Sequence, residues 1–257
     1  MHDTPSSLTL QHLVPAADSI TGCITSALEI ARAIGFDALI YDFTPVPLTP
    51  EGAMISPSFI ELRNMPEEMR RLWMEQGLYQ QDPVQALALR GSSPFFWSYH
   101  AKEASALQAS LGDATVAVST VLQDWRYSRG VTVPLHMPGN RFATLTGLWR
   151  DESYAEVEDV RDLSLMRLTY LAHATNDRLL GLFGKDELTP AGMKLSVRER
   201  ECIALAAQGL STKQIAARLN RAESTIVLHL QTAARKLGGR NRAHAIARAA
   251  HFGYLSS

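Results

Sequence analysis

The sequence predicts an α+β protein: an N-terminal α/β/α sandwich on an antiparallel sheet, followed by a C-terminal all-α domain of four helices that contains a helix-turn-helix. The first supporting observation is that helical patterns at both ends of residues 1–183 enclose several strand-like segments, an order typical of helices packed over one sheet. Glycine, proline and charged residues then replace this periodicity at 184–194. Short amphipathic segments with helix-capping signals fill residues 195–257. We therefore expect two domains, 1–183 and 195–257, joined by a linker at 184–194.

The first domain begins and ends with helical patterns. Apolar residues recur mostly every three or four positions from Leu8 to Ile34 and again from Tyr154 to Phe183. Strand-like runs between them occupy residues 38–43, 95–97, 131–135 and 142–148. We expect the apolar stripe of the last helix to serve the core of the domain and to contribute to a homodimer interface.

Local capping signals mark the helices of the second domain. Ser196 with Glu199 and Ser211 with Gln214 have the spacing of a capping box, in which the serine hydroxyl accepts from the N3 amide and the N3 side chain returns a bond. The link between the second and third helices, residues 220–222, is short enough to set them at a steep angle. These features together predict the helix-turn-helix.

Charge is distributed unevenly along the chain. Residues 188–257 contain 11 Lys and Arg against 3 Asp and Glu, whereas residues 1–187 contain 14 against 23. A basic module on an acidic body is typical of phosphate binding, which points to double-stranded DNA as a partner. In a helix-turn-helix the second helix enters the major groove. We expect base-edge contacts from Ser224, Thr225 and Leu228, and phosphate contacts from Lys213, Arg221, Arg235 and Lys236.

Both parts of the chain resemble the LuxR family of bacterial transcription regulators. The C-terminal segment is similar to the LuxR/NarL DNA-binding module over its whole length. The N-terminal segment is similar to the autoinducer-binding domain of quorum-sensing receptors, through Gly35-Phe36-Asp37-Ala38, Asp82-Pro83-Val84 followed by Trp97, and Gly130-Val131-Thr132-Val133-Pro134-Leu135. The resemblance implies a regulator that binds a small molecule and, as a homodimer, a palindromic DNA site.

The resemblance also implies a closed ligand cavity between the sheet and the helices. In the family, a carboxylate at the position of Asp82 accepts the amide N–H of the ligand, and a tryptophan at the position of Trp97 forms an aromatic wall. The glycine at Gly130 leaves room, Thr146 can reach a ligand carbonyl, and we expect Val84 to line the cavity. The residues alone allow a second interpretation of Asp82, as the cap of a helix whose first residue is a proline.

The chain departs from the lactone receptors at positions 69 and 73, where those receptors carry a tryptophan and a tyrosine. Met69 has no N–H to donate to a lactone carbonyl, and Trp73 places its donor elsewhere. A buried carbonyl left without a partner costs roughly 1–3 kcal/mol. The Met/Trp pair resembles the LuxR solos of plant-associated bacteria, which respond to plant-derived molecules. We therefore expect a non-lactone ligand, with an acyl-homoserine lactone receptor as the alternative.

Other classes of protein lack support in the sequence. No hydrolase, metalloprotease or nucleotide-binding motif occurs, and neither Cys23 nor Cys202 has a Cys or His neighbour, so we expect no enzyme, cofactor or metal site. A two-component response regulator would need an acidic pair, a phosphorylatable Asp and a Lys that cannot be placed. No apolar run could span a membrane and no signal peptide opens the chain, which favours a cytoplasmic protein.

Overall fold

The computed structural model describes residues 17–100, 102–153 and 161–255. Five antiparallel strands form the sheet of the N-terminal domain, in the spatial order β2-β1-β5-β4-β3. They are β1 (Ala38–Thr44), β2 (Phe59–Arg63), β3 (Phe95–Ser98), β4 (Arg129–Met137) and β5 (Arg141–Trp149). The four expected strands are present, each within two residues of its expected ends, but β2 was not expected. This edge strand mixes apolar residues with Glu61 and Arg63, and Ile60 is its one buried residue.

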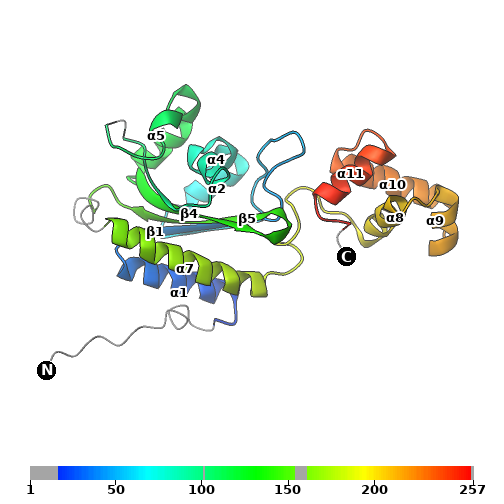
Figure 1. Cartoon of the computed structure of the whole chain (residues 1–257), viewed down its shortest axis with the longest axis horizontal. Coiled ribbons are helices and arrows are strands. Elements are labelled where there is room, and N and C mark those ends of the chain that lie inside the picture. The colour runs from blue at the N-terminus through cyan, green and yellow to red at the C-terminus, as the bar shows by residue number, and fades with distance from the viewer. Residues whose placement is uncertain (1–16, 101, 154–160, 256–257) are drawn as a thin grey trace.

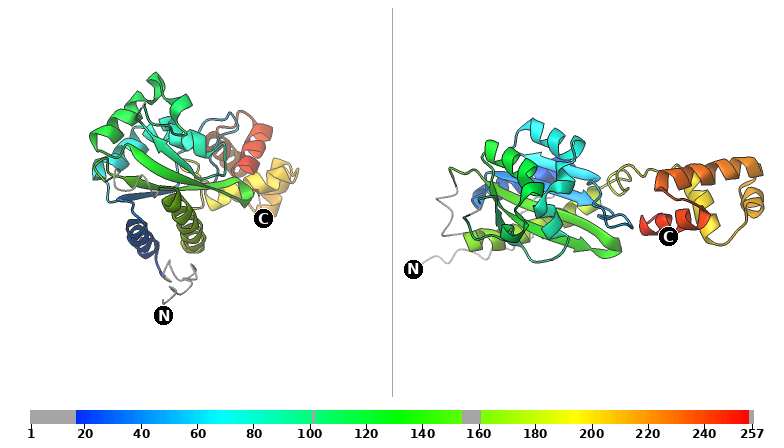
Figure 2. Two further views of the ribbon diagram at one scale, coloured as in Figure 1. Left: turned by 60° about the vertical axis from the view of Figure 1, so that its left-hand side comes forward. Right: turned by 90° about the horizontal axis from the view of Figure 1, so that it is seen from above.

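Helices cover both faces of the sheet, as expected for a sandwich (Figures 1 and 2). On one face, α1 (Ile20–Ala33) and α7 (Arg161–Leu182) pack against each other. Over the other face lie α2 (Glu67–Glu75), α3 (Leu78–Gln81), α4 (Pro83–Ala88) and α5 (Val116–Asp124). The helix expected from Leu8 begins at Ile20 in the described part of the chain, because Ser19 caps it there by accepting from the Gly22 amide. Residues 8–16 and 154–160 of the expected helices lie outside the described residues.

Four helices make up the C-terminal domain: α8 (Val197–Ala207), α9 (Thr212–Leu219), α10 (Glu223–Leu237) and α11 (Arg242–His251). Both expected capping boxes are present. The Glu199 amide donates to Ser196 Oγ at 3.2 Å, and the Ser196 amide donates to Glu199 Oε2 at 2.7 Å. The corresponding distances for Ser211 and Gln214 are 3.3 and 2.8 Å. Asn220, in the left-handed conformation, ends α9 and turns the chain toward α10, which completes the helix-turn-helix.

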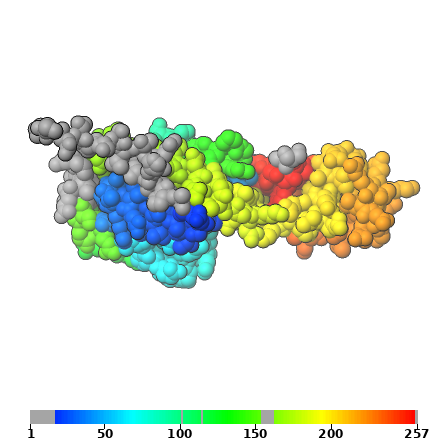
Figure 3. All heavy atoms as spheres, turned by 90° about the horizontal axis from the view of Figure 1, so that it is seen from below, coloured from blue at the N-terminus to red at the C-terminus, as the bar shows by residue number. Residues whose placement is uncertain are grey.

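A loop of the N-terminal domain contacts the last helix of the C-terminal domain, a contact that the sequence did not predict. Residues 45–58 connect β1 to β2, and Val46 and Ile55 of this loop pack in one apolar cluster with Ala249 and Phe252. Figure 3 shows the two domains as separate lobes joined by the yellow connecting segment, and Figure 1 shows the loop reaching toward α11. Two polar contacts accompany the apolar ones: His251 Nε2 lies 2.7 Å from the Leu48 carbonyl oxygen, and Arg248 forms an ion pair with Glu51.

Two further features bear on the classes of protein considered above. Within the described residues, no helix combines the length and apolar character needed to cross a membrane. In the same part of the chain, no three His, Cys, Asp or Glu side chains are grouped so as to hold a metal ion. Cys23 and Cys202 are buried free thiols whose pKa values are raised by burial, which makes both poor nucleophiles.

Candidate functional site

A small enclosed cavity lies between the sheet and the helical layer formed by α2 to α5. Its volume is about 20 Å³, enough for about one water molecule, so a larger ligand requires the surrounding side chains and helices to move apart. Six of the seven ligand-binding residues expected from the sequence line it: Met69, Trp73, Asp82, Val84, Trp97 and Thr146. Seven residues that were not expected complete the wall: Ile40, Asp42, Ile60, Tyr79, Gln85, Leu122 and Leu148.

Asp82 stands between α3 and α4, and its carboxylate serves both of them. Oδ1 accepts from the Val84 amide at 2.9 Å and so caps α4, with Pro83 at the first helical position. The same oxygen accepts from the hydroxyl of Tyr99 at 2.9 Å. Burial raises the pKa of Asp82 to about 6, although the Val84 amide and the Tyr99 hydroxyl act in the opposite direction. The side chain of Asp82 therefore both caps α4 and lines the cavity.

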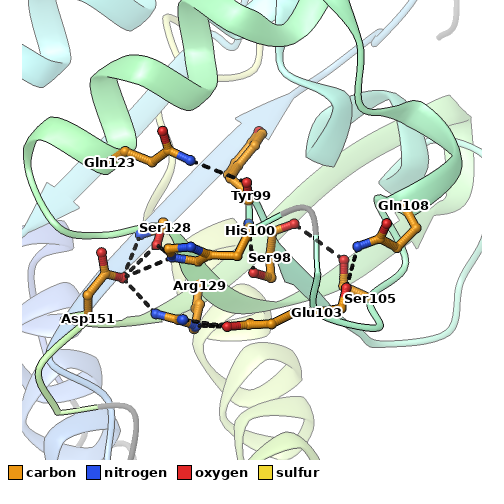
Figure 4. Close-up of polar contacts among 10 residues, drawn as sticks. All are labelled: Ser98, Tyr99, His100, Glu103, Ser105, Gln108, Gln123, Ser128, Arg129 and Asp151. Atoms are coloured by element: carbon orange, nitrogen blue, oxygen red, sulfur yellow. Dashed lines mark hydrogen bonds and ion pairs between the residues drawn. The ribbon is translucent and has the colours of Figure 1, made fainter.

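Tyr99 was not among the expected residues, yet its hydroxyl holds Asp82 in place. Its ring meets the indole of Trp97 edge-on, with centroids 5.6 Å apart. Its amide donates to the Ser128 carbonyl at 3.0 Å, and its carbonyl accepts from Gln123 Nε2 at 3.3 Å. Figure 4 shows the polar network that anchors this end of the sheet below the tyrosine ring, formed by His100, Glu103, Ser128, Arg129 and Asp151. The available signal for Tyr99 was its spacing of two residues from Trp97, because side chains two residues apart in an extended segment lie on the same face.

Trp97 forms one wall of the cavity and lies directly on Gly130 of the adjacent strand. A Cβ atom on Gly130 would stand 2.5 Å from Cζ2 of the indole and 2.8 Å from the carbonyl oxygen of Gly147. Gly130 thus leaves room for the tryptophan and does not itself line the cavity. The indole N–H donates to Thr132 Oγ1 at 2.9 Å, and that oxygen lies 2.9 Å from Thr146 Oγ1.

Met69 and Trp73 lie one turn apart on α2 and both face the cavity. Met69 is completely buried and Trp73 is 3 % exposed. The wall at position 69 is therefore a thioether that offers no hydrogen-bond donor to a bound molecule. These two side chains pack in the same apolar cluster as Trp97 and Leu148, so they serve the core of the domain as well as the cavity.

A second buried carboxylate lines the same cavity, and it was missed in the sequence. Asp42 on β1 has no exposed surface. Its Oδ1 accepts from the Tyr79 hydroxyl at 2.9 Å, and its Oδ2 accepts from Gln85 Nε2 at 3.2 Å and from the hydroxyl of Thr144. Burial raises the pKa of Asp42 to about 6 against the effect of these three bonds. The one signal in the sequence was a charged residue inside an otherwise apolar strand.

The residues expected to contact DNA lie on α9, on the following turn and on α10. Thr225 is half-buried. The other six are exposed: Lys213, Arg221, Ser224, Leu228, Arg235 and Lys236. Leu228 is 60 % exposed although Ile226, two residues earlier, is fully buried. Lys236 differs from the other cations, because its Nζ lies 2.7 Å from Oε2 of Glu199, the carboxylate that caps α8.

Comparison with known proteins agrees with this arrangement. The family model "Autoinducer binding domain" matches residues 19–179, and the model "Bacterial regulatory proteins, luxR family" matches residues 193–249. The chain is 32 % identical over 225 residues to the transcriptional activator protein BjaR1 of Bradyrhizobium diazoefficiens, which covers 86 % of this chain and 85 % of that protein. It is 27 % identical over 204 residues to the transcriptional activator protein LuxR of Aliivibrio fischeri, with coverage of 77 % and 75 %.

A solved structure shares the fold. The crystal structure of Escherichia coli SdiA matches with a TM-score of 0.56 over 94 % of both chains, at 18 % sequence identity. The enclosed cavity, the helix-turn-helix and both family models together lead to one assignment. The chain belongs to the LuxR family and is a ligand-binding transcriptional regulator with an N-terminal autoinducer-binding domain and a C-terminal DNA-binding domain.

Proposed function

We propose that this regulator responds to a small, mainly apolar, plant-derived molecule that carries an amide-like N–H and no lactone ring. Its Met/Trp pair resembles that of the LuxR solos, which respond to plant-derived molecules. The observation that carries the proposal is the combination of Asp82 and Met69 in one cavity wall. Asp82 supplies an acceptor for the N–H, whereas Met69 supplies no donor for a lactone carbonyl. A buried carbonyl left without a donor weakens binding by about tenfold to a hundredfold.

Other donors in the wall do not replace the missing one, because they are already engaged. The indole N–H of Trp73 donates to the carboxylate of Asp82. The indole of Trp97 donates to Thr132. The hydroxyl of Tyr79 and the amide of Gln85 both donate to Asp42. A lactone carbonyl would have to break one of these buried bonds, and the acceptor left behind would lose its partner.

The alternative function is an acyl-homoserine lactone receptor. The match of residues 19–179 to the autoinducer-binding model favours it, because this is the domain type to which the lactone receptors belong. The two functions share the DNA-binding output and the acceptor Asp82. They differ in the head group of the ligand, which is the part of the ligand expected to lie against Met69 and Trp73.

Thermal unfolding of the purified chain separates the two functions, since a ligand that binds the folded state raises the melting temperature by mass action. We expect fractions of plant extract to raise it and a panel of short- and long-chain acyl-homoserine lactones to leave it unchanged. The double substitution Met69→Trp with Trp73→Tyr should create lactone binding. Nanomolar binding of a lactone by the unaltered protein would instead establish the alternative.

Substitution of Asp82 tests the acceptor itself. Asp82→Ala should abolish the response to an active fraction, but it also removes the cap of α4, which costs about 1 kcal/mol. Asp82→Ser retains a capping hydroxyl while it shortens the side chain, so it should fold normally and still fail to respond. A full response by Asp82→Ser would exclude a contact between the ligand and the carboxylate.

For DNA, we infer that a homodimer binds a palindrome, with Ser224, Thr225 and Leu228 at base edges and the nearby cations at phosphates. The exposed Leu228 suits contact with a thymine methyl group. On the outer face of α7, Leu163 is 41 % exposed and Met166 is 62 % exposed, which favours this helix as part of the dimer interface.

Sedimentation velocity tests the dimer interface on α7. Met166→Glu should convert a dimer to a monomer, because it introduces a charge into an apolar contact. Val197→Glu is the matched control, since Val197 is equally exposed (61 %) but lies on α8. A monomeric wild-type chain, or a Met166→Glu chain that remains dimeric, would contradict this interface.

A further inference from the structure

We propose that the cavity recognises its ligand at two points: Asp82 accepts the amide N–H, and Asp42 accepts a second N–H or O–H at another position of the same molecule. The inference rests on the proposed function, because it concerns the same cavity and the same ligand. It adds a chemical class, an apolar molecule with two separate donor groups, and it assigns a specificity-determining role to Asp42.

The first argument is the contrast between the two faces of the sheet. Beneath α1 and α7, the strands contribute a mainly apolar core that includes Leu39, Phe43 and Leu145. The cavity face carries a group of fully or nearly buried polar side chains instead: Asp42, Thr44, Thr132, Thr144 and Thr146. Both faces are covered by helices, so solvent does not explain the difference. Folding alone does not require the carboxylate, since buried charged groups can often be replaced by apolar residues without loss of stability.

The second argument is the set of partners around Asp42. All three donors, on Tyr79, Gln85 and Thr144, are neutral. No Lys, Arg or His lines the cavity among the described residues. A carboxylate offers about four acceptor positions, of which these bonds occupy three. One acceptor position therefore remains on a group that lines the cavity, with no positive charge to compensate it.

The third argument is the electrostatic link between the two acids. Asp82 raises the pKa of Asp42, although by less than burial does. Two carboxyl groups that line one cavity are best satisfied by a ligand that donates to both. The rest of the wall is largely apolar, through Ile40, Met69 and Leu122. An amide with an apolar spacer and a terminal hydroxyl or ammonium group has this pattern, whereas a plain alkyl chain leaves Asp42 without a ligand partner.

Matched probes test the second contact. We would measure binding by isothermal titration calorimetry with the full chain, using N-acetyl amines of equal chain length that end in a methyl, a hydroxyl or an ammonium group, at several chain lengths. Wild-type protein should bind the hydroxyl or the ammonium probe at least tenfold more tightly than the methyl probe. The comparison of hydroxyl with ammonium identifies the donor that the site takes.

Variants assign the effect to Asp42. Asp42→Leu should bind the methyl probe at least as well as wild type and lose at least tenfold in affinity for the preferred probe. Asp42→Asn keeps the size of the side chain and an acceptor oxygen, so it should fold even if the leucine variant does not, and it should lose the preference for ammonium over methyl. Thr44→Val is the control, because Thr44 lies on the same face of β1, is fully buried and does not line the cavity.

The outcomes separate this inference from the proposed function. Equal binding of all three probes by wild type, abolished by Asp82→Ser, would overturn the second contact and leave amide recognition intact. A preference for the hydroxyl or ammonium probe that survives in both Asp42 variants would also overturn it. Failure of every amide probe to bind wild type would overturn amide recognition itself, and the second contact with it.

Discussion

Substitution of Gly130 by alanine is a direct test of how Trp97 packs on the sheet. The new methyl carbon would stand 2.5 Å from Cζ2 of Trp97 and 2.8 Å from the carbonyl oxygen of Gly147, whereas carbon atoms in contact keep about 3.5–4.0 Å apart. The indole must therefore move by about 1 Å, which disturbs its 2.9 Å bond to Thr132. Overpacking costs about 1–3 kcal/mol and a lost hydrogen bond about 1 kcal/mol. We expect the free energy of unfolding of this domain to fall by about 2–4 kcal/mol.

Urea unfolding followed by tryptophan fluorescence measures this loss, because all four tryptophans belong to the N-terminal domain. With a slope of about 2 kcal/mol per molar urea, the midpoint should fall by about 1–2 M. Gly181→Ala is the matched control: no atom lies within 4 Å of its Cβ position on α7, and alanine is favoured over glycine in a helix by about 1 kcal/mol. A Gly130→Ala protein that unfolds at the wild-type midpoint would refute the packing argument.

Two further predictions concern charged groups. Lys236→Ala should lower the melting temperature of the C-terminal domain, because it removes the cation that pairs with the buried Glu199. Arg235→Ala should leave stability unchanged and weaken binding to all DNA sequences. It should also reduce the salt dependence of DNA affinity by about one in slope. Differential scanning calorimetry and fluorescence anisotropy at several salt concentrations check both, and an unchanged melting temperature for Lys236→Ala would contradict the pairing. Burial raises the pKa of Asp42 and Asp82 to about 6 from an ordinary 3.8, so the folded state holds protons that the unfolded chain releases. Stability should decline as the pH rises from about 4 to about 6, by up to about 3 kcal/mol for each group. Asp42→Asn should show a smaller decline in urea midpoints over this range, and an identical decline would contradict the assignment.

Local signals made the C-terminal domain predictable from the sequence. The starts of α8 and α9 depend on residues three positions apart, Ser196 with Glu199 and Ser211 with Gln214, and both boxes form as expected. The same local logic identified Asp82 as a helix cap. The resemblance to the family then supplied the cavity-facing positions, which spacing alone could not distinguish from ordinary core residues.

The missed residues depend on contacts between segments far apart in the chain. In the sequence Asp42 is only a charged residue inside an otherwise apolar strand, because nothing local indicates that α3 and α4 will cover it. Its partner Thr144 lies 102 residues away, across a strand pairing that no local pattern specifies. Strand β2 was missed for a related reason, since an edge strand with one buried residue lacks the alternation that marks a half-buried strand.

The loop that follows β1 connects this strand of the N-terminal domain to a contact with the C-terminal domain. Asp42 faces the cavity, and four residues further along the chain Val46 is already packed against the helices of the DNA-binding domain. A shift of the cavity wall would thus have a short path to the C-terminal domain, from the end of β1 into the loop, as well as the long connection after α7. Residues at the tip of this loop, such as Glu51, touch neither the cavity nor the recognition helix. Substitutions there would change the contact between the two domains, so we expect them to alter the sensitivity of the regulator while its ligand and its operator stay the same.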